Sequence, residues 1–129
     1  MQFKLTPFER IQLLIALPRN CPLAEMGQVL RIADALDLSS NEKTRFGYEV
    51  RRIETPQGPI TFTDYNESAE GLHSYEADIE LDGVADFEKL HQFAKDRTNW
   101  PRCHESLALM DKLDAWKNET REAKKSDKT

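Results

Sequence analysis

The sequence predicts a single α+β domain: a helical hairpin plus a short helix, a three-stranded antiparallel sheet, and two C-terminal helices. Three observations favour this class. Apolar residues recur at helical spacing near both ends of the chain. Apolar and acidic residues alternate strictly around residue 78, as in a strand with one face in water. The 129 residues, 39% of them apolar and 32% charged, suit one globular domain.

A capping box predicts the start of the first helix. Thr6 is placed as the N-cap, Pro7 fits the first turn, and Glu9 can reach back to the cap. Pro18 ends the apolar face that follows, which consists of Phe8, Ile11, Leu14, Ile15 and Leu17. Residues 23–37 carry a second helical stripe. Because a short loop joins the two helices, we expect an antiparallel helical hairpin.

A second capping box, from Ser39 to Glu42, predicts a short third helix that ends at Gly47. Residues 48–53 then alternate as a strand, and Pro56, Gln57 and Gly58 form a turn. A second strand is predicted over residues 60–63, which completes a β-hairpin. Residues 64–73 show no period and are expected to be a loop.

The third strand is predicted over residues 75–81, where the alternation is strict. We expect it to join the hairpin in one sheet, with helices on its apolar face. A fourth helix is predicted over residues 84–96, and a fifth from about Pro101 to Trp116. The predicted domain spans residues 1–117. Residues 118–129 contain no large apolar side chain and are expected to be a charged flexible tail.

Charge is distributed unevenly along the chain. The 36 residues 53–88 contain ten acidic residues and no Lys or Arg, whereas the rest of the chain carries 18 basic and 13 acidic residues. A surface of one sign repels phosphate and attracts cationic groups. The middle of the chain is therefore the natural place to look for a basic partner.

The predicted binding surface is the acidic face of the third strand with the loop before it: Glu76, Asp78, Glu80, Asp64, Glu67 and Glu70. A solvated sheet face is the ordinary interpretation of such a pattern. The functional interpretation is a docking surface for a basic protein. Complementary charges on the two proteins would mainly raise the rate of association and the selectivity. Acid–base catalysis by paired carboxylates would need a cleft and a raised pKa.

The sequence offers little for catalysis or metal binding. No phosphate-binding glycine loop, G-x-S-x-G, H-E-x-x-H or paired C-x-x-C motif is present. His91, Cys103 and His104, with Cys21, lack the paired spacing of a zinc site. Cys103 as a catalytic thiol paired with His91 is geometrically possible, but the sequence gives this pairing no more support than the zinc site. We therefore predict no catalytic residue, no metal ligand, no cofactor and no enzymatic activity.

Nucleic acid binding is the alternative function. Three helices followed by a hairpin is the order of a winged helix, and residues 36–40 resemble the turn before a recognition helix. On this hypothesis the segment 39–62 contacts DNA through Lys43, Arg45, Arg51 and Arg52. The interspersed acids leave a local excess of positive charge that is small for phosphate binding.

A homodimer is a further possibility, because Trp100, Trp116 and Met110 lie on or near the predicted last helix. Core packing is the more common role of such residues. No apolar stretch is long enough to cross a membrane, so we expect a soluble, cytoplasmic protein with no membrane partner.

The opening segment from Leu5 to Pro18 resembles the start of a group of small, mostly uncharacterised phage-type accessory proteins. Helical packing residues carry the resemblance, which extends to a Ser/Glu-rich short helix and to residues 105–113. It implies a phage-type accessory or regulatory protein that acts by binding a host or phage protein. The loops at Cys21-Pro22 and Trp100-Pro101 depart from the pattern.

Overall fold

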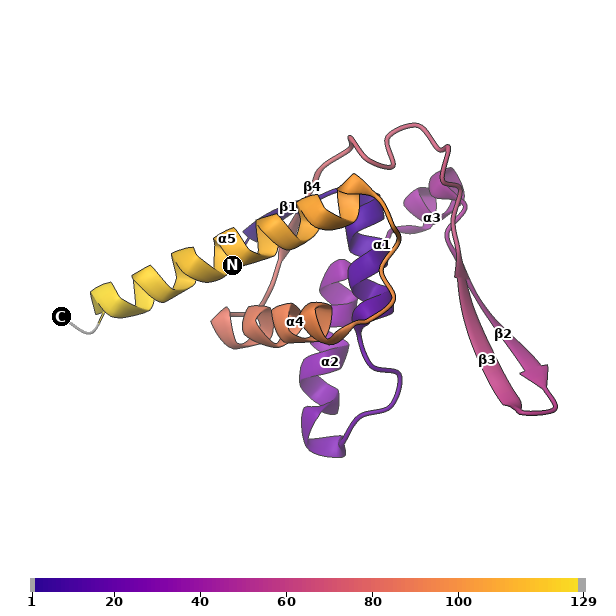
Figure 1. Ribbon diagram of the computed structural model, residues 1–129, viewed down its shortest axis with the longest axis horizontal. Coiled ribbons are helices and arrows are strands. Elements are labelled where there is room, and N and C mark those ends of the chain that lie inside the picture. The colour runs from indigo at the N-terminus through magenta and orange to yellow at the C-terminus, as the bar shows by residue number, and fades with distance from the viewer. Residues whose placement is uncertain (1, 128–129) are drawn as a thin grey trace.

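The computed structural model describes the backbone of residues 2–127 and the side chains of residues 2–120. It confirms the predicted α+β class. Within residues 2–127, five helices and four strands follow one another, and Figure 1 labels them: β1 (Gln2–Leu5), α1 (Pro7–Ala16), α2 (Leu23–Leu36), α3 (Ser40–Phe46), β2 (Glu49–Thr55), β3 (Gly58–Asp64), β4 (Ala77–Glu80), α4 (Val84–Asp96) and α5 (His104–Asp127).

Both predicted capping boxes are present. At the start of α1, the amide of Glu9 donates to the Thr6 hydroxyl over 3.2 Å, and the Thr6 amide donates to the Glu9 carboxylate over 2.9 Å. Ser39 and Glu42 repeat this exchange at the start of α3. Gly47 ends α3 with a φ of 65°, a left-handed conformation that glycine adopts without steric cost.

The predicted three-stranded sheet is wrong. The described strands form two separate two-stranded antiparallel sheets, in which β2 pairs with β3 and β4 pairs with β1. In the second sheet Phe3 lies opposite Ile79 and Lys4 lies opposite Asp78. The prediction failed because β1 has only four residues, too short a stretch to show a period before the capping box at Thr6.

The small β1–β4 sheet belongs to the main core. Phe3 and Leu5 on β1 are buried together with Ile79 on β4, and they pack against α2, α4 and α5. The Phe3 ring stacks on Phe87 of α4 at a centroid distance of 5.0 Å, and it also contacts Trp116 of α5 at 4.6 Å. This sheet therefore joins the N-terminus to both C-terminal helices.

A smaller core lies beneath α3, where Phe8, Ile11, Leu38, Phe46 and Leu72 are buried together. The connection between β3 and β4 is anchored here, because the Phe8 amide donates to the carbonyl of Leu72 over 3.1 Å.

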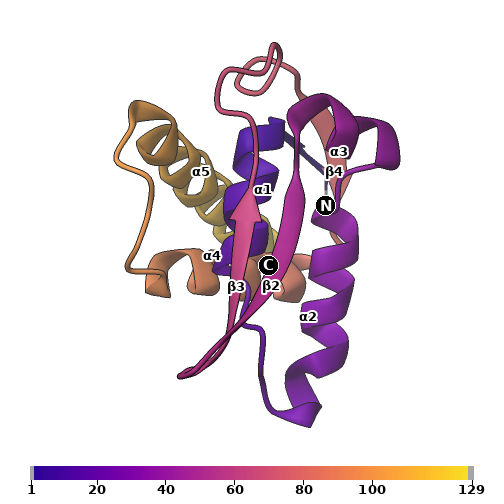
Figure 2. The same ribbon diagram turned by 90° about the vertical axis from the view of Figure 1, so that its right-hand side faces the viewer.

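The β2–β3 hairpin extends away from the helices in Figure 1, and in Figure 2, which views the molecule from the hairpin's side, the two strands lie in front of the helices. Nearly all β2 residues are exposed, and Ile53, Ile60 and Phe62 are among the exposed large apolar residues of the molecule. The hairpin touches the body at its base, where Tyr48, Val50 and Thr63 line a hollow with residues of α1 and α2.

The last helix begins at His104, slightly later than predicted, and its backbone continues to Asp127. Figure 1 shows α5 running past the rest of the molecule. Residues 118–127, which we expected to be part of a flexible tail, are therefore helical in their backbone. The end of the predicted tail, residues 128–129, lies outside the described residues.

Candidate interaction surfaces

The acidic middle segment is partly neutralised by basic residues outside it. Within the part of the chain that the structure describes, at least five of its ten acids lie within ion-pair distance of a Lys or Arg. Arg31 of α2 reaches Asp82 at 3.8 Å and Asp86 at 3.3 Å, and Lys112 of α5 reaches Glu76 at 3.8 Å. On the hairpin, Arg51 pairs with Asp64 and Arg52 pairs with Glu54. The expected one-signed surface is therefore interrupted.

Asp78 and Glu80 point into solvent from β4, as the alternation predicted, while Ile79 between them is only 5% exposed. Across the sheet they face Lys4 and Gln2 respectively. Neither carboxylate forms an ion pair with a side chain in the described part of the chain. Both carboxylates are thus available to a partner. Lys4, opposite Asp78 on β1, offsets part of their negative charge.

Glu67 and Glu70 are exposed on the connection between β3 and β4. This connection contains turns that are fixed to the body: the Asn66 amide donates to Phe46 over 2.7 Å, and the Leu72 side chain is buried. Like Asp78 and Glu80, these two acids form no ion pair with any described side chain. The six predicted binding residues therefore divide into four available carboxylates and two, Asp64 and Glu76, held in ion pairs.

The residues of the nucleic acid alternative all have partners within the protein. Lys43 lies 3.5 Å from Asp37, and the Arg45 guanidinium lies over the Tyr75 ring at 5.7 Å. Arg51 and Arg52 form the hairpin ion pairs described above. Residues 37–39 link α2 to α3, and α3, the helix proposed to contact DNA, has only seven residues.

Arg10 was not singled out in the sequence, yet it joins three helices. It is 3% exposed; its Nε donates to the Leu36 carbonyl at the end of α2 over 3.1 Å, and its NH1 donates to Glu42 of α3 over 2.7 Å. Partial burial pushes the pKa of Glu42 upward, but the hydrogen bonds from Arg10 and Ser39 outweigh burial and leave that pKa below its ordinary value. Glu42 is therefore held by Arg10 and Ser39, with 22% of its side chain exposed.

A second buried polar group links the start of the chain to the end of α4. The Gln12 amide donates to the Tyr65 hydroxyl over 3.0 Å, and Arg97 donates to both oxygens of Gln12 at 3.0 Å. Burial raises the pKa of the Tyr65 hydroxyl. The spacing of these residues along the chain carries no signal for this contact.

His91, Cys103 and Cys21 make three separate contacts. The buried His91 contacts the Asp114 carboxylate at 2.8 Å, which ties α4 to α5. Cys103 lies 3.4 Å from the Ser106 hydroxyl, and Cys21 contacts Met26. No three His, Cys, Asp or Glu side chains within the described residues are gathered closely enough to hold a metal ion.

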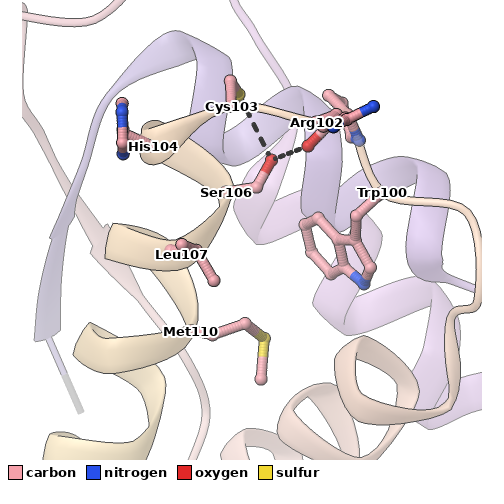
Figure 3. A pocket seen from close by; sticks show the side chains of 8 residues that line it. Trp100, Arg102, Cys103, His104, Ser106, Leu107 and Met110 are labelled. Carbon is pink, nitrogen blue, oxygen red and sulfur yellow. Dashed lines mark hydrogen bonds between the residues drawn. The ribbon is translucent and has the colours of Figure 1, made fainter.

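An apolar hollow of about 570 Å³ lies where the α4–α5 connection enters α5. In Figure 3, Trp100, Leu107 and Met110 border this hollow, and Ser106 donates to the carbonyl of Pro101 beside it over 2.8 Å. Leu107 is 66% exposed. Trp100, Met110 and Trp116, the three residues predicted for a dimer contact, are all partly buried against the main core. Trp116 packs on Phe3, and it is not among the residues that line this hollow.

Comparison with models of protein families, with curated proteins and with solved structures found no match to this chain. Among the helices of residues 2–127, none combines the length and the apolar character that crossing a membrane requires.

Proposed function

We propose that this protein is a binding module that meets a basic protein surface through the carboxylates of Asp78 and Glu80, assisted by Glu67 and Glu70. One observation supports this proposal most strongly. These four side chains stay exposed and form no ion pair with the side chains of residues 2–120, although the fold brings Arg31 and Lys112 to other acids of the same segment. The formal net charge of −5 adds a long-range attraction for cationic partners.

Such a surface acts through electrostatic complementarity. Exposed charges accelerate association and select among partners, and their effect weakens as salt screens them over about 8–10 Å at physiological ionic strength. The resemblance to phage-type accessory proteins agrees with a role in binding a host or phage protein.

The proposal is tested by charge reversal at β4. We expect the double variant Asp78→Lys/Glu80→Lys to lose partners that the unaltered protein retains in affinity purification with mass spectrometry, because both side chains would then repel a basic surface. Asp34→Lys/Asp111→Lys is the matched control, since it makes the same charge change at exposed positions of α2 and α5. Recovery of the same proteins with all three versions would exclude β4 as the binding surface.

Nucleic acid binding is a second candidate, favoured by one specific observation. Glu42, an acid within the proposed recognition helix, is paired with Arg10 at 2.7 Å, which reduces its repulsion of phosphate. The candidate requires that Lys43 and Arg45 exchange their protein contacts for phosphates.

A gel-shift assay with duplex DNA at low salt tests this candidate. Binding that weakens in Lys43→Ala/Arg45→Ala and falls steeply with salt would support it. We expect no shift, because these cations already have partners and the surrounding protein is acidic.

A further inference from the structure

A hollow of about 540 Å³ lies between α3 and β4, and we call it the α3–β4 hollow. Its volume lies within the range of small-molecule sites in proteins. The lining contains four charged side chains, those of Arg10, Glu42, Arg45 and Asp78. Arg10 and Glu42 neutralise each other as an ion pair at 2.7 Å. Arg45 and Asp78 therefore determine which charges the hollow offers to a ligand.

Arg45 is held in place without an anionic partner. Its Cζ atom lies over the rings of Phe46 and Tyr75, at 5.3 Å and 5.7 Å from their centroids. Gly71 lets the guanidinium approach closely, because a Cβ atom at that position would lie 3.0 Å from an Arg45 nitrogen. Within residues 2–120, the Arg45 side chain forms no ion pair and donates no hydrogen bond. A guanidinium stacked on aromatic rings is pre-organised to bind a carboxylate through two parallel hydrogen bonds.

Asp78 supplies the opposite charge. Its carboxylate is exposed and forms no ion pair with a side chain in the described part of the chain. Arg45 and Asp78 line the same hollow, yet they do not lie within ion-pair distance of each other. A cation and an anion that share one hollow without pairing are complementary to a ligand that carries both charges.

We propose that the α3–β4 hollow binds a zwitterion, namely a free amino acid, whose carboxylate pairs with Arg45 and whose ammonium group pairs with Asp78. The two charges also select against other ligands, because Asp78 repels a simple anion and Arg45 repels a simple cation. The Tyr75 ring, 47% exposed, adds an aromatic surface to the lining and favours an aromatic side chain on the ligand. Ser39 and Asn41 add polar groups.

The zwitterion site goes beyond the binding of a basic protein, because it depends on Arg45 and requires no protein partner. The two sites share Asp78. A bound amino acid would therefore compete with a basic partner for that carboxylate.

Titration of the isotope-labelled full chain with phenylalanine, followed by NMR, tests the proposal. We expect saturable shifts of the amide signals of Tyr75 and Ala77, with a dissociation constant of about 1 mM, as suits a small ligand in an open hollow. Phenylethylamine and phenylpropionate carry the same ring with only one of the two charges. Each should bind at least about tenfold more weakly than phenylalanine.

Arg45→Gln and Asp78→Asn each remove one charge of the hollow, and each should weaken phenylalanine binding at least about tenfold. Arg102→Gln and Asp111→Asn are the matched controls. They make the same changes at exposed positions outside the lining, so they should bind phenylalanine as the unaltered protein does.

The absence of saturable shifts up to about 20 mM phenylalanine would overturn the proposal. Binding of phenylethylamine or phenylpropionate as tight as that of phenylalanine would overturn it as well, and so would unchanged binding in Arg45→Gln or Asp78→Asn. If Asp78→Lys/Glu80→Lys loses basic protein partners while phenylalanine does not bind, the docking surface stands and the zwitterion site alone is rejected.

Discussion

Arg10 carries a full positive charge at a position that is 3% exposed, so its partners decide whether the helices tolerate it. Its guanidinium satisfies carbonyls at the end of α2, which have no partner within the helix, and it neutralises Glu42 at the start of α3. A buried pair of this kind fixes geometry more than it adds stability, but removing one member leaves the other charge uncompensated.

Glu42 should make the stability of the protein depend on acid pH. Its pKa in the folded protein lies below its ordinary value of 4.5, so it contributes stability above that pH that is lost as the pH falls through the lower, folded-state pKa. We expect the free energy of unfolding to fall more steeply below about pH 4.5 in the unaltered protein than in Glu42→Gln. Urea titrations at several pH values measure this difference.

Glu54→Gln is the control for this prediction, because Glu54 is an exposed acid with only a surface ion pair. Parallel pH profiles for the unaltered protein and Glu42→Gln would contradict the role given to the Arg10–Glu42 pair.

At the scale of elements, β1 is the strand that the sequence did not reveal, and it contributes directly to the core. Phe3 stacks on Phe87 and contacts Trp116, so it joins β1 to both α4 and α5. Phe3→Ala should lower the free energy of unfolding by about 3–5 kcal/mol, because it leaves a cavity beside the rings of Phe87 and Trp116. Lys4→Ala, on the exposed face of the same strand, should change it by less than about 0.5 kcal/mol. Equal effects in thermal or urea unfolding would show that β1 does not pack as described.

The sequence predicted elements well where the signal is local. The capping boxes at Thr6 and Ser39 depend on residues three positions apart, and the hairpin depends on the turn around Pro56. The pairing of strands could not be predicted in this way, because β1 and β4 are separated by more than half of the chain. No local sequence pattern distinguishes the pairing of β4 with β1 from its pairing with the hairpin as a third strand.

For the candidate surface too, local features could be predicted and contacts between distant segments could not. Alternation alone predicted that Asp78 and Glu80 face solvent with Ile79 inside. The neutralisation of Asp86 by Arg31, 55 positions earlier, arises only when α2 packs beside α4. The net positive charge of the flanking segments indicated that such ion pairs could form, but it did not predict which acids would remain available.

At the scale of the whole molecule, two surfaces of different character lie on different elements. Carboxylates on β4 and the preceding connection offer negative charge, while the projecting hairpin exposes the apolar side chains of Ile53, Ile60 and Phe62. Thr61→Glu on the hairpin should therefore leave capture of a basic partner by β4 unchanged.

The most direct measurement is calorimetric titration of a captured basic partner into the unaltered protein and into Asp78→Lys/Glu80→Lys, at low and at physiological salt. We expect binding to the unaltered protein to weaken as salt rises, and binding to the variant to be at least about tenfold weaker at low salt. Equal dissociation constants for the two proteins, with no dependence on salt, would contradict a role for these carboxylates.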